Sequence, residues 1–305
     1  MIAIGLDLLL GDPRSWPHPT KIAGAISVSC EKMLASRWPR SVYLGSAHWI
    51  LVVGGMLILY VVAYWLCSMI SRVAVWFLEI AVLYQAIAAR DLARHAHAVF
   101  QPLQAGDLQT ARAQLGRIVG RDTQSLDESE ISRATIESVA ESTSDGVVAP
   151  LVWTLIAGTP GALLYRTANT LDSLVGHRTE VYERFGKVSA RIDDLLNWIP
   201  ARICALGFCL FHSAVRWNAV RREAAAHASP NAGWSEAAMA YALGVRLGGD
   251  NSYDGQSIQG PVFHAAGRAA TSADVPASLG WMWRITGASA AAVVLISFAL
   301  QLLIR

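Results

Sequence analysis

Residues 117–202 concentrate side chains that could do chemistry, in a chain that is 53% hydrophobic. Glu137, Glu141 and Asp145 recur every four residues in a stretch that predicts a helix over 131–145, so they share one face. Carboxylates stacked one turn apart repel each other, and a bound cation removes that repulsion. A solvated helix face with a capping role is the alternative. However, these charges run directly into residues 147–165, which carry no charge at all.

A second polar group follows that uncharged run. Asp193 lies four residues and Asp194 three residues before Asn197 on a predicted helix. Aspartate and asparagine oxygens suit magnesium, and the planar arginine fork matches two phosphate oxygens. Two interpretations stay open, a helix end capped by Asp and paired with Arg, and a site for a magnesium-bound phosphate. The group contains Asn169, Asp172, Ser173, His177, Arg178, Arg191, Asp193, Asp194, Asn197 and Arg202.

The elements that must position these groups have a membrane composition. Only 16% of the 305 residues are charged and the mean hydropathy is +0.36, whereas soluble domains carry about 25% charged residues. A net charge of +2 without a basic run gives no indication of a nucleic-acid partner. The four cysteines have no CxxC spacing, which indicates buried thiols rather than disulfides or zinc ligands.

Long uncharged segments predict membrane spans. Residues 47–71 contain no Asp, Glu, Lys or Arg, residues 73–89 contain only Glu79, and residues 285–304 contain none. Pro150, Gly158 and Pro160 interrupt residues 147–165, which favours a broken or re-entrant segment. We expect one all-α, polytopic integral membrane domain over residues 1–305, with an apolar N-terminal helix at 1–10 and a short apolar segment at 203–215.

Charged residues between these segments set the predicted orientation. Residues 1–46 hold five Lys or Arg and residues 90–133 hold six, which places both on the cytoplasmic side of a hairpin. Residues 91–120 predict a helical hairpin that turns at Gly106 and Asp107. Residues 216–250 predict a region in which a helix carrying Glu236 ends at Gly248–Gly249, and residues 250–268 are loop-like. We therefore expect helices and loops at the cytoplasmic face of an inner membrane to form the site.

Six stretches carry a resemblance to a known family. They read LDLLLGDPRSWPHP at 6–19, GRDT at 120–123, ESVAESTSDGVVAPL at 137–151, PGALLYRTANTLDSLVGHR at 160–178, GKVSARIDDLLNWIPAR at 186–202 and SPNAGWSEAAMAYALGVRLGG at 229–249. In these stretches and their order the chain resembles the CobD/CbiB family of membrane proteins, the adenosylcobinamide-phosphate synthases of cobalamin biosynthesis. The resemblance spans nearly the whole chain.

The resemblance implies an amide ligation that uses ATP and magnesium. The family joins a carboxylate of adenosylcobyric acid, a corrinoid, to the amine of aminopropanol or its O-phosphate. A carboxylate does not react with an amine at neutral pH until it becomes an acyl phosphate, so cations and a base are needed around the transferring group. Candidate catalytic groups are Glu137, Glu141, Asp145 and Asp193, and candidate metal ligands are Glu141, Asp172, Asp193 and Asp194. Candidate substrate or phosphate ligands are Asp12, His18, Arg121, Asn169, Arg178, Arg191, Asn197, Arg202, Asn231 and Trp234.

Other classes of protein remain as alternatives. The carboxylates could relay ions in a membrane transporter, or the chain could be a membrane scaffold without catalysis. The Asp193–Asp194 pair also suggests a polyprenyl transferase, but that class needs two Asp-rich motifs and the chain offers one. The expected partners are the corrinoid, the amino alcohol, the lipid bilayer and other membrane-bound enzymes of late cobalamin assembly, with no nucleic acid.

Overall fold

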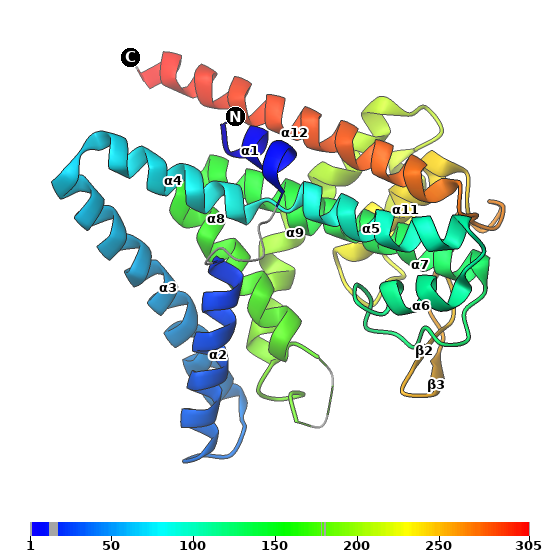
Figure 1. Cartoon of the computed structure of the whole chain (residues 1–305), viewed down its shortest axis with the longest axis horizontal. Coiled ribbons are helices and arrows are strands. Elements are labelled where there is room, and N and C mark those ends of the chain that lie inside the picture. The colour runs from blue at the N-terminus through cyan, green and yellow to red at the C-terminus, as the bar shows by residue number, and fades with distance from the viewer. Residues whose placement is uncertain (1, 12–17, 178, 180, 305) are drawn as a thin grey trace. The chain divides into compact units, whose positions relative to one another are not determined.

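The computed structural model describes all residues except 1, 12–17, 178, 180 and 305 (Figure 1). Helices dominate the described residues, and the strands among them are no longer than three residues. The all-α prediction is confirmed. The chain forms two compact units, each built from segments that are distant in sequence. Unit 1 comprises Met1–Ala88, Ala149–Asn197 and Val293–Arg305, and unit 2 comprises Ala89–Val148 and Trp198–Ala292.

Unit 1 is built around a hairpin of two apolar helices. Helix α3 (Val42–Ile70) is followed by α4 (Arg72–Ala86), and Ser71 caps α4 by accepting a 3.1 Å hydrogen bond from the Ala74 amide (Figure 1). Helices α2 (Pro19–Ala35) and α8 (Ala149–Val175) pack against α3, and α1 (Ile2–Leu10) packs against α4. Their core includes Ala23, Met56, Tyr60 and Leu163. Large apolar side chains of α3 also remain exposed, as expected of a surface that faces lipid.

Helix α8 is broken in its middle. Ala157 and Gly158 have non-helical backbone angles, and Gly158 has a positive φ of 64°. Pro160 follows, and proline has no amide hydrogen to continue a helical ladder. The interruption predicted within residues 147–165 is therefore a break at Gly158, after which the helix resumes and carries Tyr165, Asn169 and Asp172.

Unit 2 contains the more polar helices. Helices α5 (Ala89–Gln104) and α6 (Leu108–Leu115) form the hairpin predicted at Gly106–Asp107, and their apolar faces pack on α7 (Glu128–Thr143) around Leu103 and Leu115. A π-helical turn, η1 (Ser144–Val148), follows α7. Asp127 and Glu130 form a reciprocal capping box at the start of α7.

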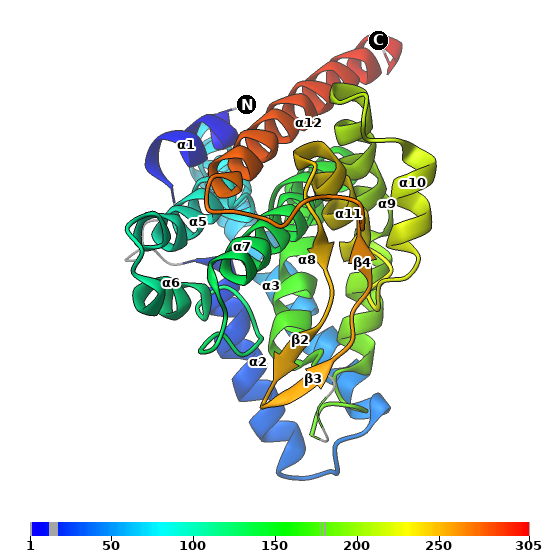
Figure 2. The ribbon, with the colours of Figure 1, turned by 90° about the vertical axis from the view of Figure 1, so that its right-hand side faces the viewer.

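The rest of unit 2 mixes short helices with short strands. These elements are α10 (Trp217–Ala224), α11 (Ala232–Leu243), β1 (Leu247–Gly248), β2 (Asn251–Tyr253), β3 (Gln256–Ile258) and β4 (Val262–Phe263). Strands β2 and β3 form an antiparallel hairpin, and β1 pairs with β4 (Figure 2). The prediction that the Glu236 helix ends at Gly248–Gly249 was wrong. Gly244 ends it in the left-handed conformation (φ 65°), which glycine adopts without steric cost.

Two helices contribute residues to both units. Helix α9 (Lys187–Phe211) is continuous, so residues 203–211 of the apolar segment predicted at 203–215 belong to the end of a 25-residue helix. The charged side chains that precede residue 203 concealed that continuity in the sequence. Helix α12 (Asp274–Ile304) is also continuous and includes the predicted span at 285–304.

Within the described residues, five helical stretches are long and apolar enough to cross a membrane. They are Val42–Ile70, Arg72–Gln104, Glu128–Val175, Lys187–Phe211 and Asp274–Leu303. This confirms the prediction of a polytopic helical membrane protein. Whether the two units act as the single domain predicted for residues 1–305 stays a prediction.

Candidate functional site

A buried carboxylate lies at the centre of the polar residues of unit 1. Asp193 on α9 is 8% exposed, and a carboxamide is bound to each of its oxygens. Asn169 on α8 donates to Oδ1 at 3.3 Å, and Asn197, one turn along α9, donates to Oδ2 at 3.0 Å. The Tyr165 hydroxyl donates to Asn197 Oδ1 at 2.8 Å, which fixes the orientation of that carboxamide. The i, i+4 spacing that the sequence showed for Asp193 and Asn197 is therefore a real contact.

Two further aspartates accompany Asp193. Asp172 on α8 and Asp194 on α9 are close enough to Asp193 to interact with it electrostatically. The Asp172 carboxylate lies directly over Gly176, where any side chain would overlap with it. Among the described residues, no Lys or Arg forms an ion pair with Asp172 or Asp193. Like charges held together at a buried position are unfavourable unless a proton or a cation joins them.

The donors in this cluster fit a metal that is shared with a substrate. Magnesium is usually held by one or two carboxylates and completes its shell with water and substrate phosphate oxygens. Asp172 and Asp193 supply two carboxylates, and the neighbouring carboxamides are also hard oxygen donors. No group of three or more His, Cys, Asp or Glu side chains in the described part of the chain could enclose a metal by itself. The cluster suits a partly protein-bound magnesium ion rather than a closed structural metal site.

Unit 2 contains a second buried carboxylate, and this one is fully paired. Glu137 on α7 is 5% exposed and accepts hydrogen bonds from three groups. Arg121 binds Oε2, while Arg133 and the Gly248 amide bind Oε1 at 3.1 and 2.7 Å. Arg121 and Arg133 also both donate to the side-chain oxygen of Asn251. This network joins the start of α7 to the β1–β2 segment, so Glu137 has a structural role in addition to any role in chemistry.

Glu236 on α11 lies close to this network without a guanidinium of its own. It is 7% exposed, and the imidazole Nε2 of His227 lies 3.9 Å from Glu236 Oε1. Burial raises the pKa of Glu236 well above its ordinary value, and the negative charges of Glu137 and Glu141 raise it further. Arg121 and Arg133 lower that pKa, but by less. Glu236 is therefore a buried acid that retains its proton to a higher pH than a free glutamate.

The GRDT stretch holds the β2–β3 hairpin in place. Asp122 Oδ2 accepts from the Ser252 hydroxyl at 2.6 Å and from the Gly255 amide at 2.8 Å, and the Asp122 amide donates to the Ser252 carbonyl at 2.8 Å. These hydrogen bonds lower the pKa of Asp122, with the Ser252 bond as the main cause. Arg121 and Asp122 thus both attach the hairpin to unit 2.

The third cluster of polar and aromatic side chains also lies in unit 2. The Arg202 guanidinium lies 4.2 Å from the ring centroid of Trp198 and 4.7 Å from that of Trp234. It also donates to Asn231 Oδ1 at 3.3 Å. Trp217 packs on Trp234 with 4.8 Å between ring centroids. Three of the predicted substrate ligands, Arg202, Asn231 and Trp234, therefore lie together.

The other predicted site residues are more dispersed. Glu141 is exposed on α7, and Asp145 is half-buried in the π-helical turn. Arg191 is exposed at the start of α9. His18 is buried, and its Nδ1 accepts a hydrogen bond from the Thr20 amide at the N-terminus of α2, which is the structural role weighed against catalysis. Asp12 and Arg178 lie outside the described residues.

Sequence analysis missed three residues of these clusters. Arg133, Glu236 and Asn251 were not named as site residues, although all three surround Glu137. The sequence did hold a signal for Glu236, the lone carboxylate in the alanine-rich stretch AGWSEAAMAYAL. Arg133 precedes Glu137 by four residues, a spacing typical of an ion pair along a helix.

Comparison with known proteins decides the family. The family model described as "CobD/Cbib protein" matches residues 1–282. The chain belongs to the CobD/CbiB family. It is 39% identical over 295 residues to "Cobalamin biosynthesis protein CobD" of Citrobacter koseri, covering 92% of this chain and 91% of that protein. It is 38% identical to "Cobalamin biosynthesis protein CbiB" of Salmonella choleraesuis and 39% identical to "Cobalamin biosynthesis protein CobD" of Streptococcus sanguinis, with more than nine-tenths of each chain covered. No solved structure matches the chain.

The stretches that suggested the CobD/CbiB family coincide with the three clusters. GRDT supplies Arg121 and Asp122, and the stretch that begins at Glu137 supplies the paired carboxylate of unit 2. The stretches at 160–178 and 186–202 supply the carboxylates and carboxamides of unit 1. In this CobD/CbiB chain, the stretches that carry the resemblance therefore also supply residues to each of the three clusters.

Proposed function

We propose that this chain is a cobinamide or cobinamide-phosphate synthase of cobalamin biosynthesis. It would join the free carboxylate of adenosylcobyric acid to the amine of 1-amino-2-propanol or of its O-phosphate. One carbon–nitrogen bond forms and ATP is converted to ADP and phosphate, so the oxygen lost from the carboxylate leaves in the phosphate. The family membership and the printed names of the relatives support a role in this pathway.

The observation that carries the chemistry is the cluster around Asp193. Asp172 and Asp193 are close together at buried or half-buried positions, and no described lysine or arginine forms an ion pair with them. A divalent cation would stabilise both carboxylates, and two carboxylates leave room in its shell for phosphate oxygens. When bound, Mg²⁺ and ATP would supply the phosphoryl group that activates the corrinoid carboxylate and the positive charge that stabilises its transfer.

The residues of this chain then have distinct roles. Asp172 and Asp193 would hold the metal, and Asn169 and Asn197 would keep the Asp193 carboxylate in one orientation through their hydrogen bonds. Trp198 is 52% exposed, so its indole can still pack on the apolar parts of the corrin while it stacks with Arg202. Asn231 is buried and accepts a hydrogen bond from Arg202, so it would hold the guanidinium in place beneath the corrin.

The membrane location is part of the proposal. We place the protein as a multi-pass protein in the cytoplasmic membrane, with its active site facing the cytoplasm where ATP is present. The stretches that could cross a bilayer and the arginine-rich segments that flank residues 47–89 support this orientation. A corrinoid is large and amphipathic, so retention at the bilayer would keep it near the later membrane-bound steps.

The direct test is synthesis by the purified protein in detergent. Adenosylcobyric acid, ATP and magnesium are incubated with 1-amino-2-propanol or with its O-phosphate, and mass spectrometry follows the amide product and the release of phosphate. We expect product with one of the two amines. Absence of product with both would reject the synthase and favour a transporter or scaffold.

Variants then test the site. Asp193→Asn should lower the rate about 100-fold or more, because it removes a charge that stabilises the transferring phosphoryl group. Asp254→Asn is the matched control, since Asp254 is exposed at the tip of the β2–β3 hairpin and asparagine tolerates its positive φ of 50°. Full activity of Asp193→Asn would show that the metal lies elsewhere, while the reaction itself would stand.

A further inference from the structure

The apolar hairpin of unit 1 contains a cavity of about 430 Å³ that none of the roles above uses. It lies between the last turns of α3 and the first turns of α4, beside the turn at Ser71 where Figure 1 shows the two helices meeting. Binding sites for small ligands commonly measure about 300–1,000 Å³, so the cavity has the size of such a site. Its lining residues are Tyr64, Ser68, Arg72, Val75, Trp76 and Glu79.

Both charges of the hairpin converge on this cavity. Between residues 41 and 89, Arg72 is the one Lys or Arg and Glu79 is the one Asp or Glu. They are about two helical turns apart on α4 and line the same cavity. In the described part of the chain, neither Arg72 nor Glu79 has a hydrogen-bond or ion-pair partner. Charges in an apolar segment are unfavourable unless they are paired, so these two groups indicate a ligand.

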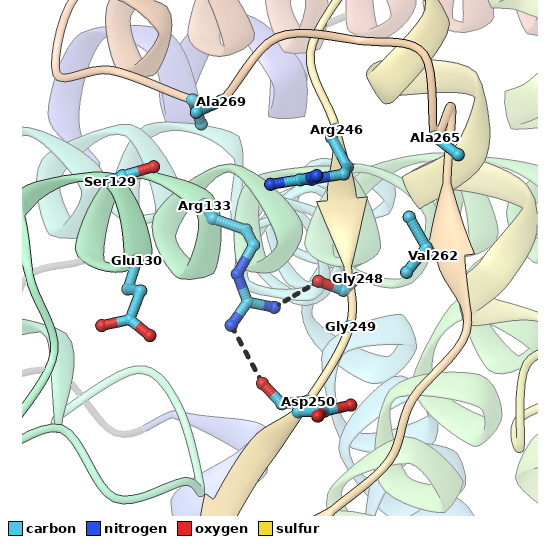
Figure 3. Close-up of a pocket in the computed structure, with 11 residues that line it drawn as sticks. Ser129, Glu130, Arg133, Arg246, Gly248, Gly249, Asp250, Val262, Ala265 and Ala269 are labelled. Carbon is cyan, nitrogen blue, oxygen red and sulfur yellow. Dashed lines mark hydrogen bonds between the residues drawn. The ribbon is translucent and has the colours of Figure 1, made fainter.

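An arginine that lines a cavity is not always available to a ligand. Figure 3 shows an occupied one in unit 2, where Arg133 donates to the carbonyls of Gly248 and Asp250 at 2.7 and 3.3 Å. Arg72 makes no such bonds within the described residues, and its side chain is exposed. Its guanidinium donors are therefore free to bind a molecule that enters the cavity.

The two charges discriminate between classes of ligand. A purely anionic group would be attracted by Arg72 and repelled by Glu79, and a purely cationic group would meet the opposite balance. A molecule that carries a phosphate and an ammonium satisfies both side chains at once. The arginine fork matches two phosphate oxygens, and the partial positive charge at the N-terminus of α4 adds to the attraction.

The surroundings of the cavity indicate that this ligand is a lipid. Tyr64 is 42% exposed and Trp76 is 64% exposed, and these two residue types concentrate at the level of the headgroups in membrane proteins. Apolar side chains on the same turns of α3 and α4 are also exposed, and they offer a surface for acyl chains that a water-soluble metabolite would not use. They include Val61, Trp65, Met69, Val73 and Phe77.

We propose that this cavity binds the headgroup of an ethanolamine phospholipid, with its phosphate on Arg72 and its ammonium on Glu79. A primary ammonium donates hydrogen bonds to the Glu79 carboxylate, whereas the trimethylammonium of a choline lipid has no N–H to donate. The bound lipid neutralises the two charges that the hairpin leaves unpaired. The site goes beyond the proposed synthase, because residues 64–79 supply none of the groups assigned to that reaction.

The test compares lipids that differ in the headgroup alone. Native mass spectrometry of the full-length protein in detergent measures the apparent Kd of phosphatidylethanolamine, phosphatidylcholine and phosphatidylglycerol with identical acyl chains. We expect phosphatidylethanolamine to bind at least about fivefold more tightly than either of the others, the change that one partly exposed charge pair contributes. Equal binding of the three lipids would overturn the proposal.

A fourth probe separates a lipid from a soluble ligand. Glycerophosphoethanolamine carries the same headgroup without acyl chains, so it should bind at least about tenfold more weakly than the lipid. Binding as tight as that of the lipid would mean that the cavity takes a soluble zwitterion, and it would overturn the assignment to a phospholipid.

Two variants locate the site. Arg72→Gln should weaken phosphatidylethanolamine about fivefold or more. Glu79→Gln should remove the preference over phosphatidylglycerol, because no carboxylate then repels an anionic headgroup. This ratio is measured within one variant, so a general loss of folded protein does not change it. Arg37→Gln and Glu183→Gln alter exposed residues of unit 1 outside the cavity and should keep the wild-type ratio. Wild-type ratios in both cavity variants would overturn the assignment.

The lipid assay uses neither the corrinoid nor ATP, so it is independent of the synthase assay. A protein that forms the amide but binds the three lipids equally would reject this site and leave the proposed reaction standing. A headgroup preference that depends on Arg72 and Glu79, in a protein that forms no amide, would support the site and reject the reaction.

Discussion

Substitution of Glu236 by Gln should change how the stability of the protein depends on pH. Glu236 is buried beside Glu137 and Glu141 on α7, and burial is the main cause of its raised pKa. Glutamine has nearly the same shape and stays neutral at every pH. The variant therefore removes one ionisable group and leaves the packing of α11 almost unchanged.

The sign follows from the two states of the protein. In the unfolded chain a glutamic acid loses its proton near pH ~4.3, whereas the folded protein holds the Glu236 proton to a higher pH. Between those two pKa values the folded state binds the additional proton, so the free energy of unfolding falls as the pH rises. The loss is about 1.4 kcal/mol per pH unit within that window and stops once the folded carboxyl ionises.

Thermal unfolding in detergent, followed by tryptophan fluorescence, measures this effect. Wild type and Glu236→Gln should unfold at similar temperatures near pH 4. As the pH rises, the unfolding temperature of the variant should exceed that of the wild type by a growing margin. His227 Nε2 lies 3.9 Å from Glu236 Oε1, so the imidazole is the neighbouring group whose contribution has to be separated. The series is therefore repeated in a His227→Asn background, where the same trend should persist.

Two results would refute this reasoning. Parallel pH curves for wild type and variant would mean that Glu236 titrates as it does in the unfolded chain. A wild type that gains stability over the variant with rising pH would mean that Arg121 and Arg133 outweigh burial and hold Glu236 ionised. Glu128→Gln, on the exposed side of α7, is the control and should follow the wild-type curve at all pH values.

Three further predictions concern other features of the two units. Glu137→Ala leaves two arginines without their carboxylate and should lower the free energy of unfolding by about 3–5 kcal/mol. Glu128→Ala is the control and should lower it far less. Chemical denaturation in detergent measures both values. Gly158→Ala places a side chain at a φ of 64° and should lower the free energy of unfolding by about 1–2 kcal/mol. Gly54→Ala adds a side chain in open space on α3 and should not destabilise the protein. Equal denaturation midpoints for the two variants would contradict the strain at Gly158. Asp193→Asn should weaken magnesium binding, measured by Mn²⁺ substitution and electron paramagnetic resonance, and unaltered Mn²⁺ affinity would exclude Asp193 as a ligand.

Features that depend on neighbours in sequence could be predicted from the sequence. The uncharged run at residues 47–71 falls largely within α3, and the four-residue spacing of Asp193 and Asn197 became a 3.0 Å hydrogen bond. The β2–β3 hairpin also had a local signal. Asp254–Gly255 is a dipeptide typical of tight hairpin turns, and both residues adopt the positive φ that such a turn requires.

Contacts between distant segments could not be predicted in this way. Arg121 binds Asn251 across 130 positions, and Gly248 binds Glu137 across 111 positions. No periodicity connects such pairs, because their proximity depends on how α7 packs against the β1–β2 segment. The same limit applies to Glu236, whose raised pKa results from charges on a different helix.

The division of the chain has a consequence for biosynthesis. Unit 1 draws on Met1–Ala88 and also on Val293–Arg305, so its last segment leaves the ribosome after nearly everything else. The early helices of unit 1 must therefore wait in the bilayer while all of unit 2 is translated. Release of the nascent chain before residue 293 should therefore leave unit 1 without one of its three segments.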